Sequence, residues 1–132
     1  MAMKGSCLCK AVVYEVDSLD MPISHCHCST CQKAHAAAFV ATAGVMRENF
    51  RWVKGEEARS SFESSKGKHR YFCSQCGSHL MAEREGAPHV ILRVATLDGD
   101  PDVKPQSHIW LSHDKPWLEY KDVPAYDEWQ TD

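Results

Sequence analysis

The chain has 132 residues, the length of one ordinary domain, and its 43% hydrophobic and 25% charged residues are typical of globular proteins. A formal net charge of -3 gives no reason to expect a nucleic-acid partner or an acidic membrane surface. The sequence shows neither a signal-peptide pattern nor an apolar run of membrane-spanning length, so we expect a cytoplasmic protein without a membrane partner.

Short strands account for most of the predicted structure. Segments rich in β-branched and aromatic residues, bounded by turn residues, predict strands at 10–16, 39–43, 51–53, 58–64, 70–72, 78–82 and 89–94. The polar segment 58–64 resembles an edge strand, whereas the nearly continuous apolar run 89–94 is typical of the middle of a core. Residues 32–38 predict one or two helical turns, and Gly44 is predicted to end the strand that follows them. No longer helical period occurs, so we predict a mainly all-β fold in a single zinc-binding domain, 1–132.

Other segments carry further expectations. The basic run 66–70 is short and lacks a wider basic face, so it is interpreted as a solvated turn. Residues 108–111 predict a last buried segment. Trp52 and Trp110 are expected in the core, and Trp117, which follows a proline, is expected in the core or at the wall of a pocket.

Seven cysteines in three groups are the main functional signal of the sequence. They are Cys7 and Cys9; Cys26, Cys28 and Cys31; and Cys73 and Cys76. An odd number of thiols cannot all pair within one molecule, and clustered cysteines in a reducing cytosol indicate metal ligands before disulfides. The first and last groups look like the two halves of a tetrahedral four-sulfur site, which leaves three thiolates for a second site. Zinc suits such ligands best, so we predict two zinc ions per chain.

The three central thiolates leave the nature of the second site open. Three ligands leave one coordination position for water or substrate, whereas a histidine or an aspartate as fourth ligand would close the site. His25 and His27 flank the cysteines and, in an extended segment, would face away from the side that Cys26 and Cys28 use. We expect these two histidines in solvent or beside the site rather than as ligands. The histidines expected to be ordinary surface or core residues are His79, His89, His108 and His113.

With these cysteines in view, the chain resembles the glutathione-dependent formaldehyde-activating enzyme family, whose domain also occurs in centromere protein V. The matching motifs are Gly5-Ser6-Cys7-Leu8-Cys9, Cys26-His27-Cys28-Ser29-Thr30-Cys31-Gln32-Lys33, Phe72-Cys73-Ser74-Gln75-Cys76-Gly77-Ser78, Thr96-Leu97-Asp98, His108-Ile109-Trp110 and Lys115-Pro116-Trp117. The resemblance implies a β-tent fold of short, mostly antiparallel sheets stapled by zinc. Its implied ligands are Cys7, Cys9, Cys73 and Cys76 for a structural zinc, and Cys26, Cys28 and Cys31 for a second, open zinc. Gln32 stands where the family often has arginine, so a cation that helped to hold an anionic substrate would be missing here.

The resemblance and the three-thiolate group together favour a zinc-dependent carbon–sulfur lyase acting on a thiol adduct such as S-hydroxymethylglutathione, which forms from glutathione and formaldehyde. A zinc with three thiolates carries a net charge of about -1 and accepts a further thiol more readily than it makes hydroxide. A nearby imidazole would move the hydroxyl proton, and His25, His27 and His35 are candidates by proximity. The alternative is a non-catalytic zinc module that binds a thiol ligand or a protein partner. The sequence does not define the oligomeric state.

Overall fold

The computed structural model describes residues 2–118 and 121–130, and strands form most of its regular structure. The strands are β1 (Met3–Ser6), β2 (Val13–Val16), β3 (Ser24–Cys26), β4 (Val40–Met46), β5 (Phe50–Lys54), β6 (Arg59–Ser65), β7 (Lys68–Cys73), β8 (His79–Arg84), β9 (His89–Arg93) and β10 (Ser107–Ile109). The helices are α1 (Ser29–His35) and the 3-10 turns η1 (Arg47–Asn49), η2 (Val94–Thr96) and η3 (Leu111–His113). The prediction of a mainly β fold built from small sheets is therefore confirmed.

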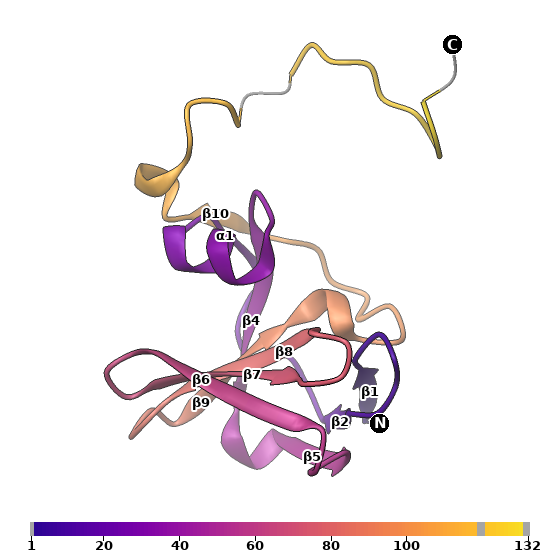
Figure 1. Ribbon diagram of the computed structural model, residues 1–132, viewed down its shortest axis with the longest axis vertical. Coiled ribbons are helices and arrows are strands. Elements are labelled where there is room, and N and C mark those ends of the chain that lie inside the picture. The colour runs from indigo at the N-terminus through magenta and orange to yellow at the C-terminus, as the bar shows by residue number, and fades with distance from the viewer. Residues whose placement is uncertain (1, 119–120, 131–132) are drawn as a thin grey trace.

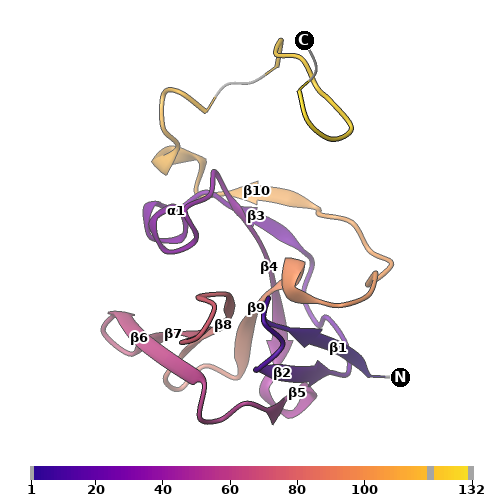
Figure 2. The same ribbon diagram turned by 45° about the vertical axis from the view of Figure 1, so that its right-hand side comes forward.

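Two sheets form the body of the molecule. The smaller has the order β1-β2-β5, and the larger has the order β10-β3-β4-β9-β8-β7-β6 (Figure 1). Neighbouring strands are antiparallel, apart from β10, which pairs in parallel with β3. Strand β4 joins two regions, because its first residues pair with β3 and the rest pair with β9. As a result α1, β3 and β10 gather at one end of β4, and both the β6–β9 strands and the small sheet lie at the other (Figure 2).

The main core lies between the two sheets. Strand β2 alternates half-buried and fully buried residues, which places Tyr14 and Val16 inside. Tyr14 packs on Phe50 of β5 and hydrogen-bonds to Thr96 through its hydroxyl group at 2.7 Å. From the larger sheet, Leu80 and other residues of β8 and β9 complete the same cluster. This core fixes the sheets against each other, so that loops from both can meet at a shared edge.

Several sequence predictions hold, and others are wrong for identifiable reasons. The segment 58–64 is an edge strand, as predicted, because β6 ends the larger sheet. Gly44 does not end a strand: it lies inside β4, where the Met21 side chain packs so closely that a Cβ atom would lie 2.3 Å from its sulfur. Strand β1 carries no β-branched residue, and it forms by pairing with β2.

The segment predicted to be buried near the carboxyl end is exposed. All of β10 and the Trp110 side chain are exposed to solvent, because β10 is the last strand at the edge of the larger sheet. Trp52 packs partly buried against the main core, as expected. Residues 121–130 are exposed and lie apart from both sheets in Figure 1. Among the described residues, no helix has the length and apolar character needed to cross a membrane.

Candidate metal centres and the adjoining cavity

The first and last cysteine groups meet, although they are far apart in the sequence. Cys7 and Cys9 follow β1 of the small sheet, and Cys73 ends β7 of the large sheet, with Cys76 in the turn after it. The Cys9 sulfur lies 3.7 Å from the sulfur atoms of both Cys7 and Cys73, and all four sulfur atoms lie within 4.8 Å of one another. The four cysteines therefore form one cluster that joins the two sheets.

Local backbone geometry holds these sulfur atoms together. The amide of Val12 donates to the Cys7 sulfur at 3.2 Å, and the amide of Gln75 donates to the Cys73 sulfur at 3.4 Å. The turn from Cys73 closes through Gly77, whose amide donates to the Cys73 carbonyl and whose φ is 81°. A positive φ at this position favours glycine, as the CxxC-Gly pattern predicts.

The central cysteines form a second cluster. Cys26 ends β3, Cys28 is the N-cap of α1, and Cys31 lies in the first turn of that helix. The amide of Cys31 donates to the Cys28 sulfur at 3.3 Å, which draws the loop and the helix together. The three sulfur atoms lie within 4.8 Å of one another, and no histidine, carboxylate or fourth cysteine of the described residues joins that group.

Both clusters fit a zinc ion on the chemistry and spacing of their sulfur atoms. A tetrahedral ion with zinc–sulfur bonds of about 2.3 Å requires sulfur atoms roughly 3.8 Å apart. The spacing of 3.7 Å in the first cluster meets this requirement. The second cluster offers three ligands and leaves the fourth position to something other than these side chains.

Two arginines from the large sheet lie against the second cluster. Arg70 of β7 is 3% exposed, and its Nη1 donates to the Cys31 sulfur at 3.7 Å while its Nε donates to Ser64 at 2.9 Å. Arg93 of β9 is also 3% exposed, and its Nε and Nη2 have no hydrogen-bond partner. The prediction that 66–70 is a solvated turn therefore holds for the turn itself. It is wrong for the part of the segment that belongs to β7, where Arg70 is buried.

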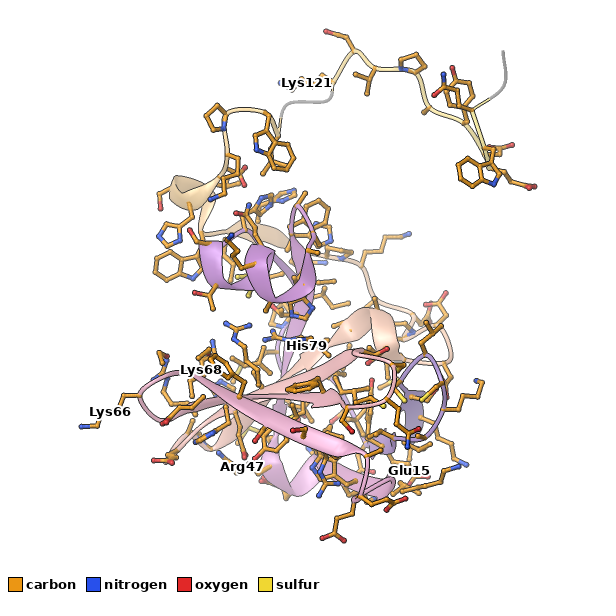
Figure 3. All side chains as sticks on the ribbon, viewed as in Figure 1. Glu15, Arg47, Lys66, Lys68, His79 and Lys121 are labelled. Carbon is orange, nitrogen blue, oxygen red and sulfur yellow. The ribbon has the colours of Figure 1, made fainter. Side chains whose placement is uncertain are left out.

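The alternation of side chains along β7 explains why part of this basic run is buried. Lys66 lies in the turn and projects away from the molecule at the end of the β6–β7 hairpin (Figure 3). Lys68 and Arg70 are two residues apart in β7, so they leave the same face of the sheet, toward the second cluster. Burial and the charges of Arg70 and Arg93 lower the pKa of Lys68.

The electrostatics of the second cluster favour a thiolate at Cys31, whereas the hydrogen bond with Cys31 and burial raise the pKa of Cys26. Hydrogen bonds from Cys26, Cys28 and Arg70, together with the charge of Arg93, outweigh burial and lower the pKa of Cys31 to about 4. Burial also lowers the pKa of the Arg93 guanidinium, and the negative charge of the cysteine sulfurs partly offsets this lowering. A thiolate and buried cations therefore stabilise each other here.

A cavity of about 410 Å³ adjoins the second cluster. It lies between α1 and strands β6, β7 and β8, and is lined by Thr30, Lys33, Ala34, Phe62, Ser64, Arg70, Phe72 and His79. Phe62 and Phe72 provide apolar walls, and Lys33 and Arg70 provide cations. Because Arg70 also contacts Cys31, the cavity and the sulfur cluster share one side chain.

His79, expected from the sequence to be an ordinary surface or core residue, lines the cavity. It lies on β8 between the sheet and α1 (Figure 3), and its ring centroid is 4.7 Å from that of His35. The Nδ1 of His79 and the Nε2 of His35 are buried without hydrogen-bond partners. Burial and the charges of Arg93 and Arg70 lower the pKa of His79, and burial with Arg93 and His79 lowers that of His35 to about 3. Both imidazoles are therefore neutral at neutral pH.

His25 and His27 lie on another face of the loop. Both rings pack on Phe39, at centroid distances of 4.4 and 5.1 Å. His27 is 7% exposed rather than solvated, with Nδ1 2.7 Å from Asp114 and Nε2 2.9 Å from Nδ1 of His108. Neither of them, nor His35, lines the 410 Å³ cavity. Of the sequence candidates for proton transfer, His35 lies closest to the cavity, through its contact with His79.

The remaining histidines are not all ordinary. His113 accepts a hydrogen bond from the amide of Ser29 at 3.2 Å, and His108 hydrogen-bonds to His27, so these histidines fasten β10 and the segment after it to the cysteine loop. His89 is half-buried with an unpartnered Nδ1 and lies on β9 outside the cavity. No spacing in the sequence marks these roles, because each partner comes from a distant segment.

Comparison with known proteins identifies the family to which the chain belongs. The sequence model of the family described as "Glutathione-dependent formaldehyde-activating enzyme" matches residues 2–113. The chain belongs to this family. A protein of Halomonas elongata, provisionally named a glutathione-dependent formaldehyde-activating enzyme, is 30% identical over 128 residues, which cover 90% of this chain and 81% of that protein.

Two further relatives of this family member are informative. An uncharacterized lyase of Schizosaccharomyces pombe is 31% identical over 77 residues, which cover 58% of this chain and 54% of that protein, so the match spans about half of its length. The crystal structure of a Rhodobacter sphaeroides protein superposes with a TM-score of 0.67 at 28% identity, covering 80% of this chain and 99% of that one. The fold therefore recurs in a solved structure.

In this formaldehyde-activating enzyme family member, Gln32 is buried and structural. Its Nε2 donates to the Ala38 carbonyl at 3.1 Å and to Asp114 at 3.4 Å. It also borders a second cavity of about 290 Å³, whose wall includes Lys115 and Trp117. Trp117 thus lines a pocket, one of the two environments expected for it. The cations near the sulfur cluster come from β7 and β9 instead of from position 32.

Proposed function

We propose that the protein is a zinc-dependent carbon–sulfur lyase that acts on the S-hydroxymethyl adduct of a small thiol such as glutathione. The observation that carries this proposal is the second sulfur cluster, which offers three ligands beside a cavity of about 410 Å³. The family match and the names of the Halomonas and Schizosaccharomyces relatives point to the same chemistry. The four-sulfur cluster is proposed as a structural zinc site that joins the two sheets.

The cavity has the groups that a peptide-like anionic thiol requires. Zinc, when bound by Cys26, Cys28 and Cys31, would supply the ability to hold a thiol in its ionised form. Lys33 and Arg70 place positive charge on the cavity wall, which suits the carboxylates of glutathione. Phe62 and Phe72 give the same cavity an apolar surface, on which the aliphatic part of a bound thiol can pack.

We assign the proton transfer to His79. In the lyase direction, the hydroxyl proton of the adduct passes to the neutral imidazole, the carbon–oxygen double bond of formaldehyde forms, and the carbon–sulfur bond breaks with its electron pair on sulfur. In the reverse direction the sulfur attacks the carbonyl carbon, and the imidazolium returns the proton to the oxygen. The lowered pKa of His79 keeps the accepting form present at neutral pH. His35 packs against His79 and positions its ring.

The test measures exchange, because glutathione and formaldehyde also combine without a catalyst. Exchange of ¹³C-formaldehyde with the glutathione adduct is followed by magnetisation-transfer NMR with and without protein. We expect acceleration by the wild type, its loss in Cys31→Ser, and a reduction of about 10²-fold or more in His79→Gln. The matched control is His89→Gln, a half-buried histidine with an unpartnered Nδ1 outside the cavity.

The outcomes separate the two functional classes. Equal exchange rates in wild type and Cys31→Ser would refute the lyase. Retained binding of glutathione without acceleration would instead support the non-catalytic zinc module. A decrease of the exchange rate in His89→Gln as large as that in His79→Gln would refute the assignment of proton transfer to His79.

A further inference from the structure

Two buried guanidinium groups at the second cluster lack the anions that normally accompany a buried arginine. Arg70 and Arg93 are each 3% exposed, and neither forms an ion pair with a carboxylate within 2–118 and 121–130. Arg93 leaves both Nε and Nη2 without a hydrogen-bond partner. Buried charges are strongly disfavoured unless they are paired, so the compensating charge must come from the cluster beside them.

The strand register puts both arginines on one face of the large sheet. Arg70 pairs with Ala82, Ala82 pairs with Ile91, and Ile91 lies two residues before Arg93. Because side chains alternate along a strand, Arg70 and Arg93 leave the sheet on the same side. The hydrogen bond from Arg70 to the Cys31 sulfur identifies that side as the one that faces the cluster.

The charges at the cluster do not balance with three thiolates alone. A zinc ion and three thiolates carry one net negative charge, whereas the two guanidinium groups carry two positive charges. The half-buried Lys68 leaves the same face of β7 and adds to the positive side. One further anion would neutralise the zinc, the three thiolates and the two arginines together, and a neutral ligand such as water would not.

We propose that Arg70 and Arg93 are positioning residues that make the fourth place at the Cys26–Cys28–Cys31 centre selective for an anion, so that it takes a thiolate in preference to a neutral ligand. This inference rests on the proposed function in one respect, because it requires that the fourth place is open. The inference goes beyond the proposed function because it assigns the selectivity for an anion to two side chains that are not metal ligands and come from strands β7 and β9.

The experiment compares an anionic with a neutral ligand at the same metal. The protein is loaded with cobalt and titrated with 2-mercaptoethanol, whose thiolate is its only charge, and separately with imidazole, while the visible bands of the metal are followed. In Arg93→Met we expect thiol binding to weaken at least about tenfold, with imidazole binding unchanged or stronger. Arg70→Met should act in the same direction. Arg93→Lys should recover most of the thiol affinity, because it restores the charge.

A matched control variant shows whether the effect on ligand binding is specific to the arginines at the second cluster. Arg51→Met removes an exposed arginine from β5 of the small sheet and should change neither affinity. Arg93→Met replaces a guanidinium whose Nε and Nη2 have no hydrogen-bond partner with an apolar side chain of similar length, and circular dichroism verifies that the variant is folded. Equal weakening of both ligands, or no change in either, would overturn the inference while the proposed function stands. A wild-type protein that binds neither ligand would overturn both.

Discussion

The four-sulfur cluster yields a quantitative prediction about stability. Cys9 and Cys73 are 64 residues apart, so a metal that joins them closes a long loop in the unfolded chain. The chain-entropy relation for a cross-link of this length gives a stabilisation of about 4 kcal/mol at 25 °C. Cys26 and Cys31 are only five positions apart, for which the same relation gives about 2 kcal/mol.

The perturbation is the double variant Cys9→Ser, Cys76→Ser. Cys9 is exposed and Cys76 is half-buried, so the substitutions disturb packing little, yet only one ligand remains on each sheet. We expect the free energy of unfolding to fall by about 4 kcal/mol, a shift on the order of 2 M in the urea midpoint. The control Leu8→Ser changes an exposed residue between two ligands and should leave the midpoint in place.

Urea titrations followed by circular dichroism and tryptophan fluorescence measure this difference. A double variant within about 1 kcal/mol of Leu8→Ser would refute the reasoning, because the cluster would then not join the two sheets in the folded protein. If Cys28→Ser lost as much free energy of unfolding as the double variant, the second cluster would also be a main structural element.

The other predictions concern metal content, acid stability and packing. Elemental analysis of freshly purified protein should give two zinc ions per chain, and one zinc with alkylation of the central thiols would contradict the second site. His35 has a pKa of about 3 in the folded chain against about 6.5 unfolded, so it lowers stability as the pH falls from about 6.5 toward 3. Urea midpoints of His35→Gln should therefore fall less than wild type between pH 7 and 5, and parallel curves would contradict this. Gly5→Ala should destabilise the fold by about 1–3 kcal/mol, because its Cβ would lie 2.1 Å from the buried Tyr14 ring, whereas Gly99→Ala, with no neighbours, should be neutral in thermal unfolding.

Sequence spacing was sufficient to predict both sulfur clusters. Thiols on one tight loop, or within one short pair, converge through local turns, and the glycine after Cys76 marks one of these turns. That the two distant pairs meet was predicted from the four ligands that a closed zinc site needs. The strand pattern was also clear where β-branched residues are dense, as in β9. It was not clear in β1, whose short sequence acquires its conformation from pairing with β2.

The charged surroundings of the second cluster could not be predicted in the same way. Arg70 belongs to a basic run that was interpreted as a solvated turn because it is short and lacks a wider basic face, and only the alternation of side chains along β7 directs Arg70 inward. Arg93 and His79 reach the site from separate strands, so the sequence places no recognisable spacing between them and the cysteines. The burial of His27 likewise depends on Asp114 and His108, more than 80 residues away.

The order in which the ligands leave the ribosome differs between the two clusters. The central thiols are complete as soon as Cys31 has emerged, whereas Cys7 and Cys9 wait for partners that come 64 residues later. At translation rates of about 5–20 residues per second, this wait lasts roughly 3–13 seconds. During synthesis the amino-terminal pair is therefore the more vulnerable to oxidants and foreign metals, and the centre proposed for catalysis is assembled before the one proposed to hold the sheets together.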